Sequence, residues 1–399
     1  MIKELILEKL MKHLIIIYLL ICLDTKLVRA NNLPFEIIKN PASTNSSSSN
    51  LASFGEEFIL SWIELDSKKT ARLKMSVWNG LRFDKNILIE ESKNMFVNWA
   101  DIPSIIEAPS GDLYAQWLDR ISSKNYSYGV RISRSINQGK NWKKLGWLHD
   151  DKSETEHGFV SLIQDGNIVR AFWLDGRMMV NPTGKMMLRT AVIDGDHIKG
   201  EIVLDNNVCT CCPTSAAQLS DGPIVIYRDR SPKEIRDISF SRRRNNNWTE
   251  PSTLKKDNWL IPGCPVNGAS LAANNGVVAI SRYTVTLNKA KVILRLFNNG
   301  RNKSGKEIVL DENNPIGRCV TVCSQNMVYT IWIGLQKNQT VLRLAEVSPS
   351  GDIIRKKTLT TVKGNRSSGT PRAIVKRGYL WLSWTDANNI RLGRIKIDG

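Results

Sequence analysis

A pattern that recurs about every fifty residues constrains this 399-residue chain more than any other feature of its sequence. In each copy an apolar run ends at a turn, and a second run that carries an aromatic residue, usually Trp or Tyr, follows the turn. The turns lie 51 to 56 residues apart, at Gly55, Gly111, Gly166, Gly222, Gly276, Met327 and Gly378. Seven copies at one period indicate a repeat architecture, in which each unit buries its apolar face against its neighbours.

A second marker has the same period. In Ser135–Trp142 the spacing Ser-x-Asn-x-Gly-x-x-Trp predicts a turn in which the Ser and Asn side chains bond the backbone and Gly139 has a positive φ. Degenerate copies keep this spacing around Gly80, Gly195, Asn245, Gly300 and Gly351. Two independent markers in register indicate that the units are structurally equivalent.

Each unit has the pattern of four strands, and no segment after residue 40 shows the 3.6-residue periodicity of a helix. We therefore predict an all-β fold, a β-propeller of seven four-stranded blades. Six blades, or a string of separate small β domains, are the alternatives. The seventh unit ends before its fourth strand, and we expect Pro34–Lys39 to supply it beside Ile390–Ile397. Residues 31–50 are then a closing strand and a polar loop (41–50), and residues 51–399 are the propeller.

The first thirty residues have the pattern of an export signal. Leu14–Leu23 is an uninterrupted apolar run that follows basic residues and is too short to span a bilayer. Val28 and Ala30 stand at the two positions that a signal peptidase reads. We predict a signal peptide over residues 1–30 and an exported protein, periplasmic or secreted, with no transmembrane anchor after cleavage. A lipid anchor on Cys22 and a buried apolar helix are the alternatives.

The chain is strongly basic. Its 56 Lys and Arg against 38 Asp and Glu give a formal net charge of +18. In an exported protein this charge favours an acidic glycan or another anionic ligand as the partner; charge spread for solubility is the alternative. The short basic run Arg242–Arg244 falls on an expected turn and has no interleaved aromatic residues. We therefore expect no nucleic-acid partner, and we expect a monomer.

Loops on one face of a propeller enter the innermost strand of each blade or join its second and third strands, and here they hold most of the unusual polar clusters. The candidate catalytic acids and bases are Asp101, Glu156 and His157, with His157 as a general base. Guanidinium groups pair with carboxylate or sulfate through two parallel hydrogen bonds. The expected ligand-binding residues are Arg177, Arg228, Arg230, Arg236, Asp229 and Asn267. Structural ion pairs and turn caps are the alternative for each.

Six cysteines follow residue 30, and three of them occupy matching places in consecutive repeats. Because export favours disulfides, we predict a bridge from the cluster Cys209, Cys211 and Cys212 to Cys264. The alternative is a soft metal ion such as Cu(I), held by the Cys-x-Cys-Cys segment and Cys264, with methionines at 178–179 or 186–187 nearby. Under the disulfide interpretation we expect no metal and no cofactor.

Several segments resemble those of exported bacterial sialidase-like proteins with degenerate Asp-box (BNR) repeats. They are FVNWADIPSI (96–105), TEHGFVSL (155–162), FWLDGR (172–177), VCTCCPTSAA (208–217), YRDRSPKEIRDI (227–238) and IPGCPVNGASL (261–271). The turn marker resembles the Asp-box of this group, with Asn137 in place of Asp. The resemblance covers residues 51–399 and implies a sialidase-like propeller.

Sialidases bind the substrate carboxylate with three arginines and use a Tyr nucleophile assisted by a Glu, with an Asp as acid and base. Here ADIP (100–103) replaces the Phe-Arg-Ile-Pro motif of the first arginine, and Tyr227 and Tyr283 fall within expected strands. The resemblance implies a glycoside hydrolase of exo-sialidase type that acts on an acidic glycan through an arginine cluster. The alternatives are a non-catalytic propeller that binds a glycan or a protein on the same face and, third, a copper-binding cysteine cluster.

Overall fold

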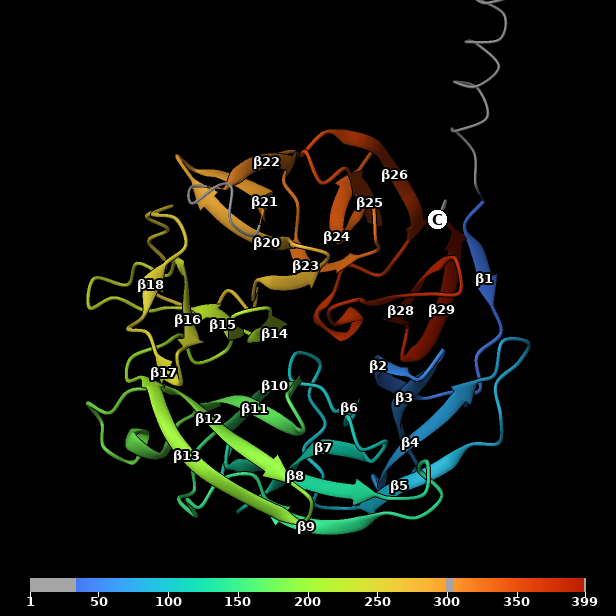
Figure 1. Ribbon diagram of the computed structural model, residues 1–399, viewed down its shortest axis with the longest axis vertical. Helices are drawn as coiled ribbons and strands as arrows, with labels where there is room; N and C mark the ends of the chain where they lie inside the picture. Colours follow the sequence, from blue (N-terminus) through green and yellow to red (C-terminus); the bar gives the residue numbers. More distant parts are fainter. Residues whose placement is uncertain (1–33, 299–304, 398–399) are drawn as a thin grey trace, which may run out of the picture.

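The computed structural model describes residues 34–298 and 305–397, and in this part of the chain seven antiparallel sheets surround a central axis (Figure 1). The first strands of neighbouring blades contact one another all the way round the axis. The predicted all-β propeller of seven blades is therefore confirmed, and the six-bladed and beads-on-a-string alternatives are wrong. The predicted signal peptide lies outside the described residues.

Within each blade the strands follow one another in chain order. Blade 1 contains β2 (Ser46–Phe54), β3 (Glu57–Leu65), β4 (Ala71–Trp78) and β5 (Ile87–Ser92). Blade 2 contains β6 (Ser104–Glu107), β7 (Leu113–Arg120), β8 (Tyr128–Ser135) and β9 (Lys143–Trp147). Blade 3 contains β10 (His157–Asp165), β11 (Ile168–Asp175), β12 (Met187–Asp194) and β13 (His197–Asp205). Blade 4 contains β14 (Ser215–Leu219), β15 (Gly222–Arg228), β16 (Ile238–Arg244) and two short outer strands, β17 (Asn247–Trp248) and β18 (Ser252–Thr253).

The remaining blades have the same order. Blade 5 contains β19 (Ser270–Asn274), β20 (Val277–Thr286), β21 (Lys289–Asn298) and β22 (Lys306–Asp311). Blade 6 contains β23 (Gly317–Cys323), β24 (Val328–Gln336), β25 (Gln339–Val347) and β26 (Ile353–Thr361). Blade 7 contains β27 (Arg372–Lys376), β28 (Tyr379–Asp386), β29 (Asn389–Lys396) and β1 (Glu36–Ile38). The described part has two short 3-10 helices, η1 (Arg177–Val180) and η2 (Arg366–Ser368), and no helix there is long and apolar enough to cross a membrane.

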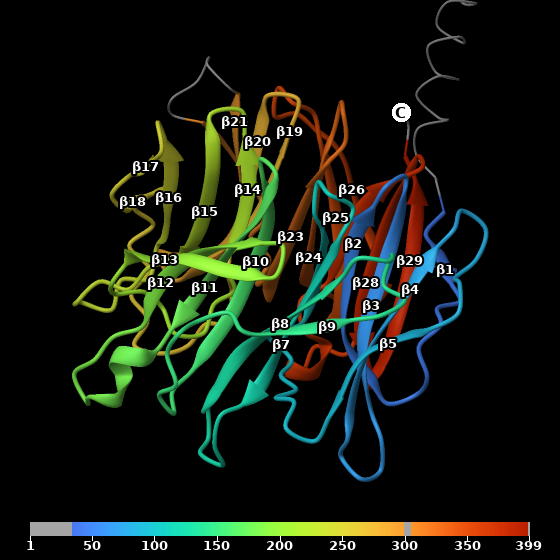
Figure 2. The ribbon, with the colours of Figure 1, turned by 60° about the horizontal axis from the view of Figure 1, so that its bottom comes forward.

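Blade 7 closes the ring with strands from both ends of the chain, as the sequence predicts. Strand β1 pairs antiparallel with β29, with Glu36 opposite Arg394 and Ile38 opposite Leu392. Figure 2 shows the two strands side by side at the edge of the ring. Next to β1, Phe35 packs against Trp384, with ring centroids 5.9 Å apart. The N-terminal segment thus covers the edge that β29 would otherwise expose.

Tryptophans of the second strands form much of the core between blades. Those most completely buried there are Trp62, Trp117, Trp173, Trp332 and Trp381, each at most 1% exposed. In three blades the indole N–H donates to the carboxylate two residues later: Trp62 to Glu64 (2.8 Å), Trp117 to Asp119 (3.1 Å) and Trp173 to Asp175 (2.8 Å). A buried N–H needs such an acceptor. The acid that follows Trp in the repeat therefore has a structural role.

The Ser135–Trp142 turn has the predicted hydrogen bonds. Ser135 Oγ accepts from the Gly139 N–H (2.9 Å), and Asn137 Oδ1 accepts from the Asn141 N–H (2.9 Å). Gly139 has φ 85°, and a Cβ at that position would lie 2.9 Å from the Met75 side chain of blade 1. Both the backbone conformation and the close contact therefore require glycine here.

The expected polar loop at 41–50 is wrong in its second half. Strand β2 begins at Ser46, so residues 46–50 belong to the innermost strand of blade 1. Ser46, Ser48 and Ser49 are buried, and Ser46 Oγ accepts from the Ile390 N–H at 3.1 Å. These serines replace the apolar residues that normally mark a buried strand, and this is why composition predicts a loop.

Candidate active site

The innermost strands of blades 1, 2, 3, 4 and 7 line an open cavity of about 270 Å³ at the propeller axis. One residue of each innermost strand pairs with a residue of the second strand that, in six of the seven blades, comes directly before a Trp or Tyr. In successive blades this position holds Asn50, Ser104, Ser161, Ser215, Ser270, Val320 and Arg372. Asn50, Ser104, Ser161 and Ser215 line the cavity together with Arg372. Because the side chains at this position are small in four of these blades, they leave space near the axis at the level of Arg372.

Asp101 lies at one wall of this cavity, in the loop that enters β6. The residue is 3% exposed, and its Oδ2 atom accepts a 2.7 Å hydrogen bond from the Phe159 N–H. Burial raises the pKa of Asp101 to about 8, and the nearby charge of Glu156 acts in the same direction. The Phe159 hydrogen bond and the positive charge of Arg372 oppose this shift without cancelling it. Asp101 is therefore largely protonated at neutral pH.

Glu156 is the carboxyl group that interacts with Asp101, although it does not itself line the axial cavity. It lies immediately before β10 and accepts a short hydrogen bond from the Tyr128 hydroxyl. Burial raises the pKa of Glu156 to about 7 against the Tyr128 hydrogen bond, and the cysteines Cys264 and Cys209 add to the rise. Tyr128 is itself fully buried and stacks on Phe96 at 4.2 Å. Its hydroxyl keeps its proton because burial raises the pKa of Tyr128 well above the usual value.

Arg372 at the start of β27 is the cation of the cavity. No hydrogen bond or ion pair to its guanidinium occurs among the described residues, and its Nε atom is buried without a partner. Burial lowers the pKa of Arg372 to about 10, which leaves it charged at neutral pH. Arg372 is half-buried, and an anion from outside the chain would satisfy its buried Nε atom. In the sequence, Arg372 could have been identified because it stands at a repeat position that holds a small polar residue in five other blades.

Arg318 lines a smaller cavity of about 50 Å³ that Arg372 also lines. Its Nη1 atom donates to the carbonyl oxygens of Asn365 and Gly369, both at 3.1 Å. Its guanidinium lies 4.6 Å from the centre of the Trp99 ring. Burial lowers the pKa of Arg318 to about 10. Arg318 therefore adds positive charge to the axis, although its hydrogen bonds are partly used by the backbone.

The four arginines expected at the site already have partners. Arg177 pairs with Asp175 (2.8 Å) and with Asp150 (2.8 Å), and Arg228 is 1% exposed with its guanidinium bound to the carbonyl oxygens of Asn267, Arg236 and Tyr283. Arg230 and Arg236 share Glu234, at 2.6 and 2.8 Å. None of the four lines the axial cavity. The structure thus does not bring the four arginines together as a site for one anion, because nearby carboxylates and carbonyl oxygens already accept their hydrogen bonds.

Two further expected ligand-binding residues brace the backbone. Asn267 Oδ1 accepts from the Arg318 N–H (2.6 Å), and its Nδ2 donates to the Ile316 carbonyl oxygen (3.2 Å). Asp229 accepts from the Arg230 N–H (2.6 Å) and from Ser239 (3.0 Å). Burial raises the pKa of Asp229, with the charge of Asp205 as a second cause. Both residues lie outside the lining of the axial cavity.

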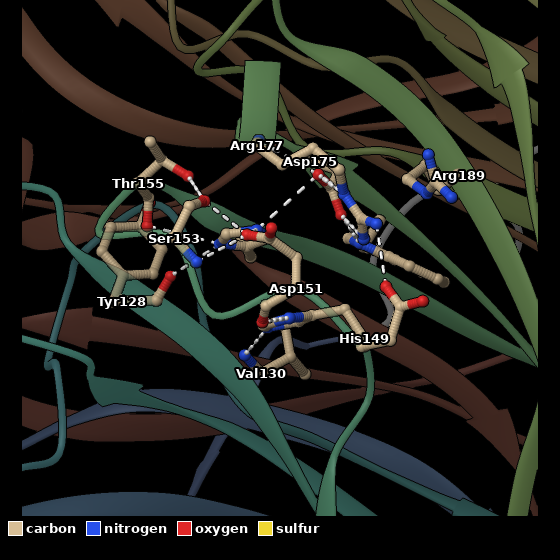
Figure 3. Close-up of polar contacts among 12 residues, drawn as sticks. Tyr128, Val130, His149, Asp151, Ser153, Thr155, Asp175, Arg177 and Arg189 are labelled. Atoms are coloured by element: carbon tan, nitrogen blue, oxygen red, sulfur yellow. Dashed lines mark hydrogen bonds and ion pairs between the residues drawn. The ribbon is translucent and has the colours of Figure 1, made fainter. Parts of the chain in front are cut away.

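His157 is fully buried and does not line the cavity. Its Nε2 atom lies 3.0 Å from Asp151 and 3.6 Å from Asp175, and its ring stacks on His149 at 4.1 Å. Figure 3 shows Asp151, Asp175 and Arg177 turned toward one another in this separate cluster. Burial, together with the neighbouring His157, lowers the pKa of His149 to about 4. The expected general base is therefore enclosed in a structural cluster rather than presented to a substrate.

The cysteine cluster lies close to Glu156, as the effect of Cys209 and Cys264 on its pKa indicates. All six described cysteines are free, and the predicted bridge to Cys264 is absent from this structure. Cys209 Sγ lies 3.9 Å from Cys211 Sγ and 3.6 Å from Cys212 Sγ. Hydrogen bonds from Cys211 and Cys212, aided by the charge of Arg236, lower the pKa of Cys209 against its burial. Of the methionines proposed beside a metal, Met178 and Met179 are exposed, whereas Met186 packs in a core cluster against which Cys211 also packs.

A larger hollow of about 440 Å³ lies between blades 5 and 6. Its buried carboxylate, Asp311, already accepts hydrogen bonds from Trp332 (2.7 Å) and Arg343 (3.1 Å). The other carboxyl group in its lining, Glu312, is exposed, and size alone does not make this hollow the functional site.

No protein-family model and no curated protein matches this chain. Among solved structures it is similar to the polysaccharide lyase Uly1, with a TM-score of 0.57 and 10% identity over 88% of this chain and 90% of that chain. It is also similar to an ancestral GH74 enzyme, with a TM-score of 0.53 and 11% identity over 92% of this chain and 51% of that chain. At these identities the similarity shows a shared fold, and no family match supports the specific sialidase-like family.

Proposed function

We propose that this protein is exported and cleaves a glycosidic bond in an acidic glycan, with Asp101 as the general acid and Glu156 as its carboxylate partner. The proposal depends on one observation: Asp101 at the axial cavity interacts with Glu156, and the pKa values of these two carboxyl groups are raised to about 8 and about 7. At neutral pH Asp101 holds a proton that it can give to a leaving oxygen. Glu156 is partly ionised under the same conditions and can act as a base or a nucleophile.

Arg372 supports an acidic substrate. Its guanidinium has no partner among the described residues and lines the same cavity as Asp101. A carboxylate or sulfate group on the sugar would satisfy two of its N–H groups at once. The distance between the charged group and the cleaved bond in the substrate then decides which glycans fit.

Exo-sialidase-type hydrolysis is the finer form of the proposal. An Asp, a Tyr–Glu pair and an arginine are the residue types that the sequence resemblance implies for such an enzyme. Tyr128 is fully buried and donates to Glu156, so we assign the chemistry to Glu156 and treat Tyr128 as a positioning residue.

The test is a cleavage assay on the purified mature protein with sialylated, uronate-containing and sulfated glycans. We expect one class to yield a new reducing end without an unsaturated sugar, since hydrolysis adds water whereas elimination leaves a double bond. Asp101→Asn and Glu156→Gln should each reduce the rate by about 10²–10⁴-fold. Glu250→Gln, at an exposed surface residue, is the matched control. Cleavage that survives both site variants would contradict the assignment.

The paired state of Arg177, Arg228, Arg230 and Arg236 favours a second candidate, a non-catalytic propeller that binds a glycan in the channel. This candidate predicts that an acidic glycan binds saturably in calorimetry and stays intact after long incubation with the protein. It also predicts that Asp101→Asn binds the glycan as well as the wild type does. Loss of binding on Arg372→Met would then locate the glycan in the channel.

A further inference from the structure

Three cysteine sulfurs in the loop before β14 already have the spacing of ligands around one metal ion. Sγ of Cys209 lies 3.6 Å from that of Cys212 and 3.9 Å from that of Cys211, and all three lie within 4.8 Å of one another. Four sulfurs bound to one ion at the ~2.3 Å of a zinc–thiolate bond lie about 3.8 Å apart. Trigonal coordination by three sulfurs at the same bond length gives about 4.0 Å. The observed separations match these values and are far longer than the ~2.05 Å of a disulfide.

The surrounding backbone holds the first of these sulfurs in place. The Cys209 N–H donates to the Arg228 carbonyl oxygen (3.0 Å), and Val208 forms a bridge with Asp229 and donates to Met186 (2.9 Å). Cys209 and Cys212 are 0% and 1% exposed, so a bound ion would be shielded from water on that side. Such pre-organisation reduces the cost of binding.

Charge at the cluster favours thiolates. Arg236 Nη1 donates to Cys209 Sγ at 3.1 Å, and Arg236 is itself 4% exposed. A guanidinium in this place compensates the excess negative charge that three or four thiolates give a monovalent or divalent ion. It is also the kind of second-layer hydrogen bond that orients metal ligands.

A fourth sulfur comes from the loop before β19. Cys264 is exposed, its Sγ lies 3.5 Å from Thr210 Oγ1, and its thiol interacts with that of Cys211. The site is therefore closed on the Cys209–Cys212 side and accessible from solvent on the Cys264 side, which gives an ion a path of entry.

We propose that Cys209, Cys211 and Cys212, with Cys264 as a fourth ligand, bind one thiophilic d¹⁰ metal ion, Cu(I) or Zn(II). Soft thiolate ligands select these two ions. A sulfur that still carries its proton releases it to solvent when the metal–sulfur bond forms, a thiolate binds directly, and no electron is transferred. The proposal goes beyond the proposed glycan cleavage and does not depend on it.

The experiment is metal binding by the purified full-length mature protein, reduced and kept without oxygen. One portion receives Zn(II) and another receives Cu(I), each in competition with a chromophoric chelator, and bound metal is counted by elemental analysis. We expect one ion per chain for at least one of the two metals, and the competition decides which. Sulfur coordination is checked by X-ray absorption at the metal edge.

Variants assign the site. Cys211→Ser and Cys264→Ser remove the two accessible ligands with the least risk to folding, and Cys209→Ser removes the buried one. All three should lower the affinity by at least about 10-fold, and Arg236→Gln should lower it by about 10–100-fold as a second-layer change. Cys323→Ser, a cysteine of β23 in blade 6, is the matched control and should bind like the wild type.

Three outcomes would overturn the proposal. The first is a reduced wild-type chain that binds neither ion above the level of the Cys211→Ser variant. The second is an equal loss in Cys323→Ser. The third combines two results: mass mapping of the freshly isolated protein finds the cluster in disulfides, and the protein binds no metal after reduction. None of these outcomes concerns glycan cleavage, so the two proposals fail separately.

Discussion

The Asp101 Oδ2 atom accepts a 2.7 Å hydrogen bond from the main-chain N–H of Phe159, whose φ is 55°. The bond joins the loop that enters blade 2 to the innermost strand of blade 3. A left-handed backbone at a residue other than glycine costs free energy, and it persists here because the neighbouring blades fix it. The position of the proposed acid therefore depends on a second blade as much as on its own loop.

Gly158→Ala should displace Asp101, because a Cβ at Gly158 would lie 1.9 Å from the Asp101 Oδ2 atom. We expect the rate of glycan cleavage to fall at least about 10-fold, with a loss of about 1–3 kcal/mol in unfolding free energy. Gly263→Ala is the control, since nothing lies within 4 Å of its added Cβ. Equal behaviour of the two variants would show that the Asp101 position is not constrained as the structure indicates.

The pH dependence of kcat/KM should be bell-shaped. Glu156 must lose its proton, which requires a pH above about 7, and Asp101 must keep its proton, which requires a pH below about 8. The optimum is therefore expected between these values. A plateau that extends to pH 5 would contradict the roles given to the two groups.

Tyr128→Phe should move the acidic limb of that profile to higher pH. The Tyr128 hydroxyl lowers the pKa of Glu156, so its removal raises that pKa further. The Phe ring keeps the stacking contact with Phe96, and folding should be preserved. A fall in rate without a shift of the acidic limb would instead indicate that Tyr128 contacts the substrate.

Asp101 also makes stability depend on pH. Its pKa rises from an ordinary value near 3.8 to about 8 on folding, so the folded state binds a proton that the unfolded state releases. This contribution is fully present below about pH 4 and is lost as the pH rises through about 8. Asp101→Asn should therefore gain stability relative to the wild type over this window, by up to roughly 1 kcal/mol per pH unit. Urea unfolding at pH 4.5, 6 and 8 measures the effect, with Glu250→Gln as the control.

Arg372→Met should weaken binding of an acidic glycan by about 1.5–3 kcal/mol, the contribution of a charged hydrogen bond. Because the buried Nε atom of Arg372 has no hydrogen-bond partner, the same change should raise the unfolding free energy of the ligand-free protein. Arg377→Met, at an exposed ion pair with Glu57, should change neither quantity by more than about 1 kcal/mol. If Arg372→Met both binds the glycan more weakly and is less stable than the wild type without ligand, the view that Arg372 lacks a partner in the free protein is contradicted.

The closing strand should contribute strongly to stability. Deletion of Pro34–Lys39 exposes the edge of β29, and we expect a loss of several kcal/mol in unfolding free energy. Phe35→Ala should reproduce part of this loss because Phe35 packs on Trp384. Ile37→Ala, at a side chain that is 59% exposed, should change stability by less than about 0.5 kcal/mol. A deletion variant as stable as the wild type would contradict the closure.

The sequence predicts the architecture well because the repeat is encoded locally. A turn residue, a buried Trp and a Ser-x-Asn-x-Gly turn each determine a few residues, and their common period determines the ring. The start of β2 at Ser46 escapes this reasoning because the innermost strand faces polar surroundings near the axis. Burial in a channel does not require apolar residues where their polar groups find partners.

The site is less accessible to sequence reasoning. Asp101 and Glu156 are identified by their loops, whereas Arg372 is absent from the sequence-based candidates although it lines the cavity. Charged motifs such as Asp175–Arg177 and Arg228–Arg236 attract attention because their charges cluster, and the same clustering lets them neutralise one another. Arg372 instead stands alone at a repeat position that is small and polar in five other blades, and no nearby acid forms an ion pair with it among the described residues.

The pairing of β1 with β29 has a consequence for the order of assembly. The residues of this pair are separated by more than 350 positions, so the first strand made must wait for the last one made. Blades 1 to 6 each consist of strands that are close in the chain and can form while synthesis is still under way. Blade 7 is complete only after the last strand of the chain has been made. Ring closure is therefore a late event in the life of the newly made chain.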